Sequence, residues 1–293
     1  METAEPDRLR SFLIPALGTR GVWAHLDAAW LAVAGDHGYP QTVRRLLGQA
    51  LAATTLLAGN LKSPGRLSLH LKSTGDLRTL FAECDHEGHV RGIARLADVF
   101  DSQGDIDLSR LPEPLLGITL ERTDLERYQG LIAVEHASLG AVLEDYFAQS
   151  EQLHTRMWLS ADASRCAGLM LQQLPSGSET GAGFEEAAIL ASTLRVEELL
   201  TLDSVTLLRR LFAEHDLRLA NGIALAFSCT CSRARVGRMF ESLGREEAFA
   251  ALADDRAEVR CEFCNRCWVF DRIDLTRIFM TGGWIAPPEP TAH

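Results

Sequence analysis

Five of the seven cysteines lie within 39 residues near the C-terminal end, and four of these form two short-spaced pairs. The pairs are Cys229-Thr230-Cys231 and Cys261-Glu262-Phe263-Cys264, with 29 residues between them. Folding that brings the two pairs together would supply four thiolates, a ligand set that suits tetrahedral Zn²⁺. The short spacing also allows each pair to close into a disulfide. These residues therefore predict metal binding, redox chemistry or both.

Three kinds of zinc site can be compared with this spacing. A structural zinc knuckle would stabilise a unit of about 60 residues that is otherwise marginal. A hydrolytic site is disfavoured, because catalytic zinc usually takes His or carboxylate ligands and no His lies between His215 and His293. A zinc-ribbon nucleic-acid-binding or regulatory protein is the main alternative, since arginines flank both pairs, although acidic residues nearby cancel their charge. The arginines are Arg233, Arg235, Arg238, Arg260 and Arg266, and the acidic residues are Glu241, Glu246, Glu247, Asp254, Asp255 and Glu258.

The other three cysteines lead to separate expectations. Cys267 follows Cys264 after two residues. It either packs beside Trp268 as a small side chain, or competes as an alternative zinc ligand or as a disulfide partner for Cys264. Cys84 and Cys166 lie in strand-like runs and are expected to be buried core thiols.

The composition limits the class of protein. At about 150 residues per domain, 293 residues predict roughly two domains, and a hydrophobic content of 46% is enough for a full-sized core. With 29 basic and 40 acidic residues the net charge is −11, which disfavours non-specific nucleic-acid binding. The N-terminus lacks a signal-peptide pattern, no stretch approaches 18 consecutive apolar residues, and an odd, clustered set of cysteines suits a reducing compartment. A cytoplasmic protein with no membrane partner is therefore expected.

Hydrophobic periodicity predicts an α+β core domain over residues 1–175. Residues 41–60 follow Pro40 and carry apolar side chains at the spacing of a helix with one buried face, and a second helix is predicted over 139–151. Short apolar or alternating runs between turn residues predict strands at hairpin spacing. These runs are 67–71, 80–84, 90–96, 117–120, 130–134, 157–160 and 168–171.

A hinge and a helical linker are predicted over residues 176–228. Five of the eight residues at 176–183 are Gly or Ser, which is typical of a flexible connection. Short helical patterns follow from Phe184, and their apolar faces are too small to form a core alone. These helices must therefore pack on another part of the chain. They are either an extension of the first domain or a docking region whose apolar face can be uncovered.

Two sets of segments resemble one protein family. The set around the cysteines comprises Phe227-Ser228-Cys229-Thr230-Cys231-Ser232-Arg233, Leu243-Gly244-Arg245-Glu246-Glu247, Cys261-Glu262-Phe263-Cys264-Asn265, Phe270-Asp271 and Asp274-Leu275. The set in the core comprises Tyr39-Pro40, Leu61-Lys62, Glu126-Arg127-Tyr128-Gln129-Gly130, Leu143-Glu144-Asp145-Tyr146-Phe147, Ser150-Glu151-Gln152-Leu153 and Gly168-Leu169-Met170-Leu171-Gln172. Together they resemble the heat-shock protein 33 family of redox-regulated chaperones, in the expected order over nearly the whole chain.

The resemblance implies an ATP-independent holdase chaperone that is inactive while reduced and zinc-bound. It implies that Cys229, Cys231, Cys261 and Cys264 hold one Zn²⁺ per chain. On oxidation these residues would form the disulfides Cys229–Cys231 and Cys261–Cys264, release zinc and unfold the linker, which exposes apolar surface to unfolding client proteins. A homodimer is implied for the oxidised form, and no nucleic-acid partner is expected.

The expected organisation is therefore α+β, with a mixed strand-and-helix core, a helical linker and a small C-terminal zinc-binding module. The zinc redox-switch domain is predicted over 229–285 and a disordered tail over 286–293. The chain departs from the family pattern at the added Cys267 and at His154, where proline is usual. It shows no nucleophile elbow, phosphate loop or dinucleotide fingerprint, and Ser150-Glu151-Gln152 is interpreted as a structural cluster. We therefore do not expect an enzyme.

Overall fold

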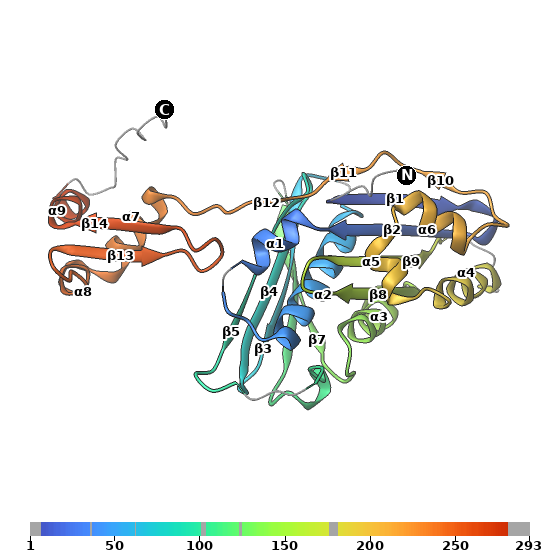
Figure 1. The fold of residues 1–293 in the computed structure, drawn as a ribbon, viewed down its shortest axis with the longest axis horizontal. Coiled ribbons are helices and arrows are strands. Elements are labelled where there is room, and N and C mark those ends of the chain that lie inside the picture. The colour runs from blue at the N-terminus through green and yellow to red at the C-terminus, as the bar shows by residue number, and fades with distance from the viewer. Residues whose placement is uncertain are drawn as a thin grey trace. The chain divides into compact units, whose positions relative to one another are not determined.

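The chain folds into two compact units, Met1–Ser228 and Cys229–His293 (Figure 1). The computed structural model describes residues 7–35, 37–61, 63–100, 104–122, 125–175 and 181–280. The predicted tail over 286–293 and the 176–180 part of the predicted hinge lie outside these residues. Within them, strands and helices are mixed along the chain, which confirms the predicted α+β class.

The first unit contains two sheets and the helices packed on them. Its strands are β1 (Arg8–Ile14), β2 (Thr19–Leu26), β3 (Gly65–Lys72), β4 (Leu77–Asp85), β5 (His89–Leu96), β6 (Leu115–Arg122), β7 (Leu125–Ala133), β8 (Thr155–Ala161), β9 (Cys166–Gln173), β10 (Arg218–Leu219), β11 (Ile223–Ala224) and β12 (Ala226–Phe227). Its helices are α1 (Ala28–Ala34), α2 (Gln41–Ala58), α3 (Leu139–Ser150), α4 (Ala182–Ser192), α5 (Val196–Thr201) and α6 (Ser204–Leu211), with 3₁₀ turns at Pro15–Leu17 and Leu108–Arg110.

The two sheets differ in how they are ordered. The first runs β10-β1-β2-β9-β8, with β11 also paired to β1, and its main strands are antiparallel. The second runs β12-β5-β4-β3-β6-β7, and only the short β12 pairs in the parallel sense. Every strand predicted from the alternation of apolar residues lies in or overlaps one of these strands. The pair β1 and β2 was not predicted, because β2 is almost wholly buried and its apolar residues do not alternate with polar ones.

Helix α2 occupies the centre of the first unit, where strands of both sheets pack against it. The prediction of one buried face was wrong, because nearly every residue from Leu46 to Ala58 is buried. Small residues such as Gly48 and Ala52 let the two sheets approach the helix from different sides. The buried hydroxyls of Thr54 and Thr55 donate to the carbonyl oxygens one turn earlier, which satisfies them inside an apolar environment.

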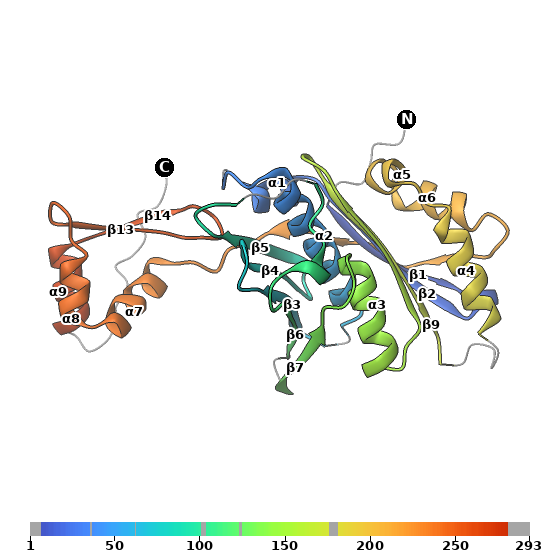
Figure 2. The ribbon, with the colours of Figure 1, turned by 90° about the horizontal axis from the view of Figure 1, so that it is seen from below.

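The opposite face of the first sheet is covered by α4, α5 and α6 (Figure 2). These helices bury Phe184, Leu199 and Leu208 against strand residues that include Trp23 and Leu169. Strand β9 is therefore buried on both faces, with α2 on one side and these helices on the other, which explains its continuous apolar sequence. The prediction that the short helices must pack on another part of the chain is confirmed.

An extended segment after α6 runs along the edges of both sheets of the first unit. β10 and β11 pair with β1, and β12 then pairs with β5. Gly88 permits this path, because its φ is +88° and a Cβ there would lie 2.2 Å from the Ala224 carbonyl oxygen. The amide of Ser228 donates to the Val90 carbonyl oxygen at 3.0 Å, one residue before the first cysteine of the C-terminal unit. Among the described residues, no helix combines the length and the apolar character that crossing a bilayer would require.

Candidate metal centre

The C-terminal unit is small and has a correspondingly small apolar core. Its elements are α7 (Arg233–Leu243), α8 (Arg245–Ala250), β13 (Arg256–Arg260), β14 (Cys267–Asp271) and α9 (Arg272–Met280). The two strands form an antiparallel hairpin. Between residues 229 and 280, the part of this unit that the structure describes, the buried apolar residues are Phe240, Ala248, Ala257, Trp268, Phe270, Leu275 and Ile278. So few buried side chains make a unit of this size depend on additional stabilisation.

Each cysteine pair lies in a short connection that the backbone fixes. Cys231 directly precedes the N-cap residue of α7, Ser232, whose hydroxyl accepts from the Arg235 amide. The second pair lies in the turn between β13 and β14, where the Cys261 amide donates to the Arg266 carbonyl oxygen at 2.9 Å. Asn265 closes this turn with a φ of +57°, a left-handed conformation that Asn tolerates well.

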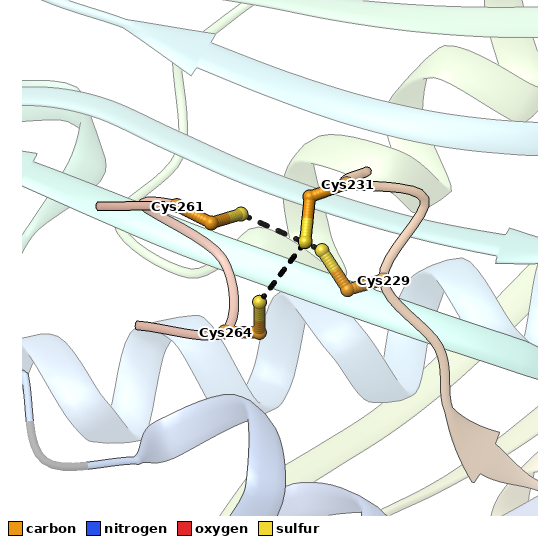
Figure 3. Close-up of side chains that lie close together, drawn as sticks. All are labelled: Cys229, Cys231, Cys261 and Cys264. Carbon is orange, nitrogen blue, oxygen red and sulfur yellow. Dashed lines mark hydrogen bonds between the residues drawn. The ribbon is translucent and has the colours of Figure 1, made fainter. Parts of the chain in front are cut away.

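The four predicted ligands come together (Figure 3). The sulfur atoms of Cys229, Cys231, Cys261 and Cys264 all lie within 4.8 Å of one another. Between the two pairs, the Cys229 sulfur lies 3.5 Å from that of Cys261, and the Cys231 sulfur lies 3.4 Å from that of Cys264. Sulfurs around a tetrahedral Zn²⁺ at 2.3 Å would be about 3.8 Å apart, so these residues fit the ion. All four are free cysteines of intermediate exposure.

The protein environment acts differently on these thiols. Burial raises the pKa of Cys229 and of Cys231 above the ordinary thiol value. Burial also acts to raise the pKa of Cys261, but hydrogen bonds from the backbone N–H groups of Cys264 and Phe263 outweigh it and lower that pKa. The turn that carries the second pair thus directs backbone donors at a sulfur that metal binding requires as a thiolate.

Arg233 connects the first cysteine pair to the rest of the small unit. Its guanidinium donates to the Val269 carbonyl oxygen at 2.7 Å and forms an ion pair with Asp274 at 2.5 Å. It also lies over the ring of Phe270, 4.2 Å from the centroid. One of the arginines behind the nucleic-acid alternative is therefore engaged inside the unit. Another, Arg266, lies over the Trp268 ring at 4.4 Å.

The three remaining cysteines lie outside the four-sulfur cluster. Cys267 begins β14, and its thiol lies 3.8 Å from a carboxylate oxygen of Glu258 on the neighbouring strand. Its sulfur is not among those that lie within 4.8 Å of one another. Cys84 and Cys166 are completely buried, which confirms their expected place in the core. Burial raises the pKa of Cys84 to about 12 and also raises that of Cys166, so both should be unreactive thiols.

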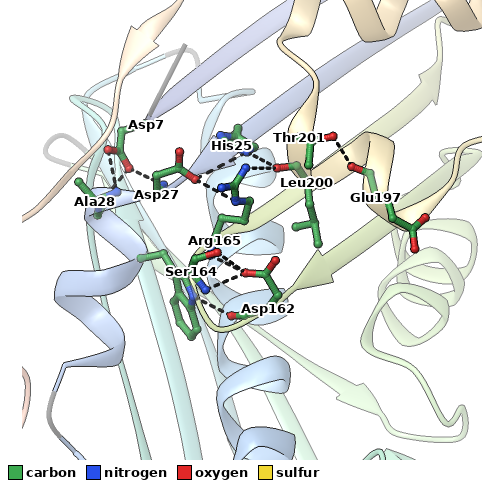
Figure 4. Close-up of polar contacts among 12 residues, drawn as sticks. Asp7, His25, Asp27, Ala28, Asp162, Ser164, Arg165, Glu197, Leu200 and Thr201 are labelled. Carbon is green, nitrogen blue, oxygen red and sulfur yellow. Dashed lines mark hydrogen bonds and ion pairs between the residues drawn. The ribbon is translucent and has the colours of Figure 1, made fainter. Parts of the chain in front are cut away.

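A polar cluster in the first unit joins the linker helices to the core (Figure 4). The backbone carbonyl oxygen of Leu200, in the last turn of α5, lies 2.9 Å from Nε2 of His25 and accepts from Arg165 at 3.1 Å. The Asp27 carboxylate lies near both donors, 3.8 Å from Nε2 of His25 and 3.7 Å from Nε of Arg165. These residues were not predicted from the sequence. A histidine within the buried run of β2 is the signal that could have found them, since a buried polar side chain requires a partner.

Comparison with known proteins gives a consistent result. The family model described as "Hsp33 protein" matches residues 7–271. The chain is 41% identical over 292 residues to the 33 kDa chaperonin of Nitrosococcus oceani, covering 98% of this chain and 99% of that protein. It is also 41% identical over 294 residues to the 33 kDa chaperonin of Azotobacter vinelandii, with coverage of 98% and 99%.

A solved structure supports the fold. The crystal structure of the 33 kDa chaperonin, a heat-shock protein 33 homologue, from Thermotoga maritima superposes with a TM-score of 0.78 at 18% identity. The match covers 93% of this chain and 97% of that one. With the family model and two full-length relatives in agreement, we conclude that this chain belongs to the Hsp33 family of chaperones.

Proposed function

We propose that this chain is a redox-regulated holdase, inactive while its cysteines are reduced and zinc-bound. Oxidation would activate it to hold unfolding proteins and prevent their aggregation without ATP. The observation that carries the proposal is the cluster of four free thiols within 4.8 Å, located in a unit with little apolar core. In such a unit, the oxidation state of the sulfurs controls the stability of the fold.

Cys229, Cys231, Cys261 and Cys264 would bind one metal ion per chain. A bound Zn²⁺ would keep the sulfurs as thiolates, the form that reacts with oxidants, and would contribute folding free energy. The backbone N–H groups of Phe263 and Cys264 already point at the Cys261 sulfur and would favour its ionised form. The same four residues would therefore be both the stabilising centre and the sensor.

The disulfides we propose, following the family resemblance, are Cys229–Cys231 and Cys261–Cys264. In each pair, one thiolate attacks a peroxide oxygen, which gives a sulfenic acid and, after protonation, water. The second thiol then displaces the hydroxyl group as a further water and closes the S–S bond, so that two electrons and two protons pass to each peroxide. In the reduced structure the sulfur contacts at 3.4 and 3.5 Å join cysteines of different pairs, so both loops must rearrange before these disulfides can close. A disulfide sulfur is no longer a thiolate ligand, and the C-terminal unit would lose its main source of stability.

Unfolding of the C-terminal unit would affect the first unit through the segment of chain that connects them. Cys229 follows Ser228, whose amide is bonded to Val90 at the edge of the second sheet. The segment before it is held to the first unit by the two-residue strands β10, β11 and β12 and by the side chain of Leu225, which is buried in the core of that unit. We propose that residues 176–228 connect a core domain over 1–175 to a switch domain over 229–285. We also propose that their helices act as a releasable cover on the first sheet of the core. Release of α4 to α6 would expose the apolar face that now packs on them.

The residues of that apolar face make it suitable for binding unfolding proteins. It contains large side chains such as Phe12, Trp23 and Leu171, all buried in the described structure. Unfolding clients present apolar segments of many sequences, which non-directional burial can accommodate. We further propose that the oxidised form is a homodimer and that the protein works in the cytoplasm, where a reducing environment keeps the switch off.

A light-scattering assay tests this function. A thermally unfolding client is heated with the reduced, zinc-loaded chain or with the peroxide-treated chain, both without ATP. The oxidised chain should suppress aggregation and the reduced chain should not. A variant with Ser at positions 229, 231, 261 and 264 should give the same result before and after peroxide. Equal suppression by the reduced and oxidised wild-type chain would refute redox control.

A further inference from the structure

A cavity of about 610 Å³ opens in the first unit, on a side where several distant segments meet. Half of its lining residues come from the core segments that carry the resemblance to the Hsp33 family, and none of them is a cysteine. Those segments are far apart in the sequence and supply Tyr128 from β7, Tyr146 from α3, Glu151 after α3, and Gln172 from β9. The switch mechanism proposed above uses none of these side chains.

One wall of the cavity holds a guanidinium in a fixed position. Gln172 is 2% exposed, and its side-chain carbonyl oxygen accepts from Arg20 at 2.7 and 3.1 Å and from Asn60 at 3.2 Å. The Gln172 amide nitrogen donates in turn to the Thr155 hydroxyl at 3.2 Å. This arrangement uses the buried amide to orient Arg20 along the wall.

No carboxylate among the described residues neutralises the charge of Arg20. Arg20 forms no ion pair with any carboxylate of the described residues, and its hydrogen bonds go to a neutral amide. Burial lowers the pKa of Arg20 from its usual value, but a guanidinium stays charged at neutral pH. Arg122, at the exposed rim of the same cavity, likewise has no ion pair with a described residue. A half-buried cation of this kind favours an anion from outside the chain.

A second part of the lining is a chain of two tyrosine hydroxyl groups that ends on a carboxylate. The hydroxyl of Tyr128 lies 3.1 Å from that of Tyr146, which donates to Glu151 at 3.2 Å. Burial is the main cause that raises the pKa of Tyr146, so its hydroxyl remains protonated. The rest of the surface is mainly apolar, with Leu57, Leu67, Ile118 and Leu153 among its residues.

We propose that this cavity binds an apolar ligand that ends in a carboxylate, with the carboxylate on Arg20 and the apolar part on the leucine and isoleucine side chains. Glu151 lines the same cavity and would repel a phosphate dianion more strongly than a carboxylate, which favours a ligand with a single negative charge. A cavity of this size matches the volume range of small-molecule sites. A fatty acid and the C-terminal residue of a protein chain share the required chemistry.

Calorimetric titration of the full-length, reduced chain tests the proposal. Decanoate should bind, and decanol, which has the same chain without the charge, should bind at least about tenfold more weakly. Arg20→Gln should weaken decanoate binding by about tenfold or more and leave decanol binding unchanged. Arg78→Gln, an exposed arginine outside the cavity lining, is the matched control and should change neither.

A second variant and a peptide ligand complete the test. Leu120→Trp fills the cavity from a half-exposed position on β6 and should abolish decanoate binding even if Arg20→Gln fails to fold. Acetyl-Ala-Leu with a free carboxylate or with an amide end reports whether a protein C-terminus can also bind. The proposal is overturned if the wild-type chain binds neither carboxylate, or binds decanoate no better than decanol. Because the chain stays reduced, this result does not depend on the redox switch.

Discussion

Nε2 of the His25 imidazole, in core strand β2, lies 2.9 Å from the backbone carbonyl oxygen of Leu200 at the end of linker helix α5. The carbonyls in the last turn of a helix lack partners within the helix, and here the core supplies two donors, His25 and Arg165, to one of them. The His25 side chain is 3% exposed and its ring stacks on Trp23, with 5.8 Å between the ring centroids, so its position is fixed. This contact joins the proposed cover to the sheet that it buries.

The first prediction concerns this contact. His25→Phe keeps a ring that can stack on Trp23 but removes the hydrogen bond to Leu200, which costs about 1 kcal/mol of linker docking. Hydrogen exchange of the amides in α5 and α6 should become several-fold faster, while exchange in β3 to β6 stays unchanged. His136→Phe, which alters a half-exposed histidine before α3, is the control. Unchanged exchange in α5 would show that the contact does not hold the helix.

The second prediction concerns the close packing of α4. A Cβ at Gly183 would lie 2.8 Å from the Leu17 carbonyl oxygen and 2.9 Å from the Leu17 Cα, so Gly183→Ala must push the helix off the core. The strain is worth about 1–3 kcal/mol, and the variant should suppress client aggregation at a lower peroxide dose than the wild type.

The matched control for Gly183 is Gly222→Ala. A Cβ at Gly222 would have its nearest neighbours at 3.4 Å, an ordinary contact distance. This variant should respond to peroxide as the wild type does. If Gly183→Ala and Gly222→Ala gave the same dose response, docking of α4 would not limit activation.

The third prediction concerns the metal ligands. Cys231→Ser removes one of four clustered sulfurs and should reduce the zinc content of the purified chain well below one ion. Cys267→Ser should retain one zinc per chain, because the Cys267 sulfur lies outside the cluster and beside Glu258. Atomic absorption together with a colorimetric chelator measures both variants. Loss of zinc from Cys267→Ser would show that the ligand assignment is wrong.

The fourth prediction concerns pH. Burial raises the pKa of Cys84 to about 12, so the unfolded chain loses this proton at a lower pH than the folded chain does. The contribution of Cys84 to the free energy of unfolding is therefore fully present below the ordinary thiol pKa. It is lost as pH rises toward 12, and the free energy of unfolding then falls by at most about 1.4 kcal/mol per pH unit. Urea unfolding of the wild type and of Cys84→Ala between these limits measures the effect. The Cys84→Ala curve should fall less steeply with pH, and equal slopes would contradict the burial effect.

The sequence predicted most of the elements because their residues carry strong local signals. In β3 and β5, apolar residues alternate with polar ones along much of the strand, which indicates a strand with one face in the core. The short spacing of the cysteines limits the chemistry of their thiols to metal binding or disulfide formation. The buried state of Cys84 and Cys166 followed from the apolar runs around them.

Features that depend on tertiary structure could not be predicted in this way. Strand β2 is buried on both faces, so its sequence shows no period. Helix α2 is enclosed by two sheets, which no pattern within its own residues reveals. The partner of His25 is a backbone carbonyl 175 residues away, and every residue has such a carbonyl. The segments around Tyr128, Tyr146 and Gln172 carried the family resemblance, but only the fold shows that they line one cavity.

The most direct test of the account measures zinc and holdase activity in the same sample. The reduced, zinc-loaded chain is titrated with peroxide, and each dose is assayed for released zinc, for the disulfide-linked peptides of Cys229–Cys231 and Cys261–Cys264, and for suppression of client aggregation. We predict that all three rise together over one dose range and reverse together on reduction. Zinc release with both disulfides formed but no suppression of aggregation would contradict the central claim that the four-cysteine unit controls exposure of the client-binding surface.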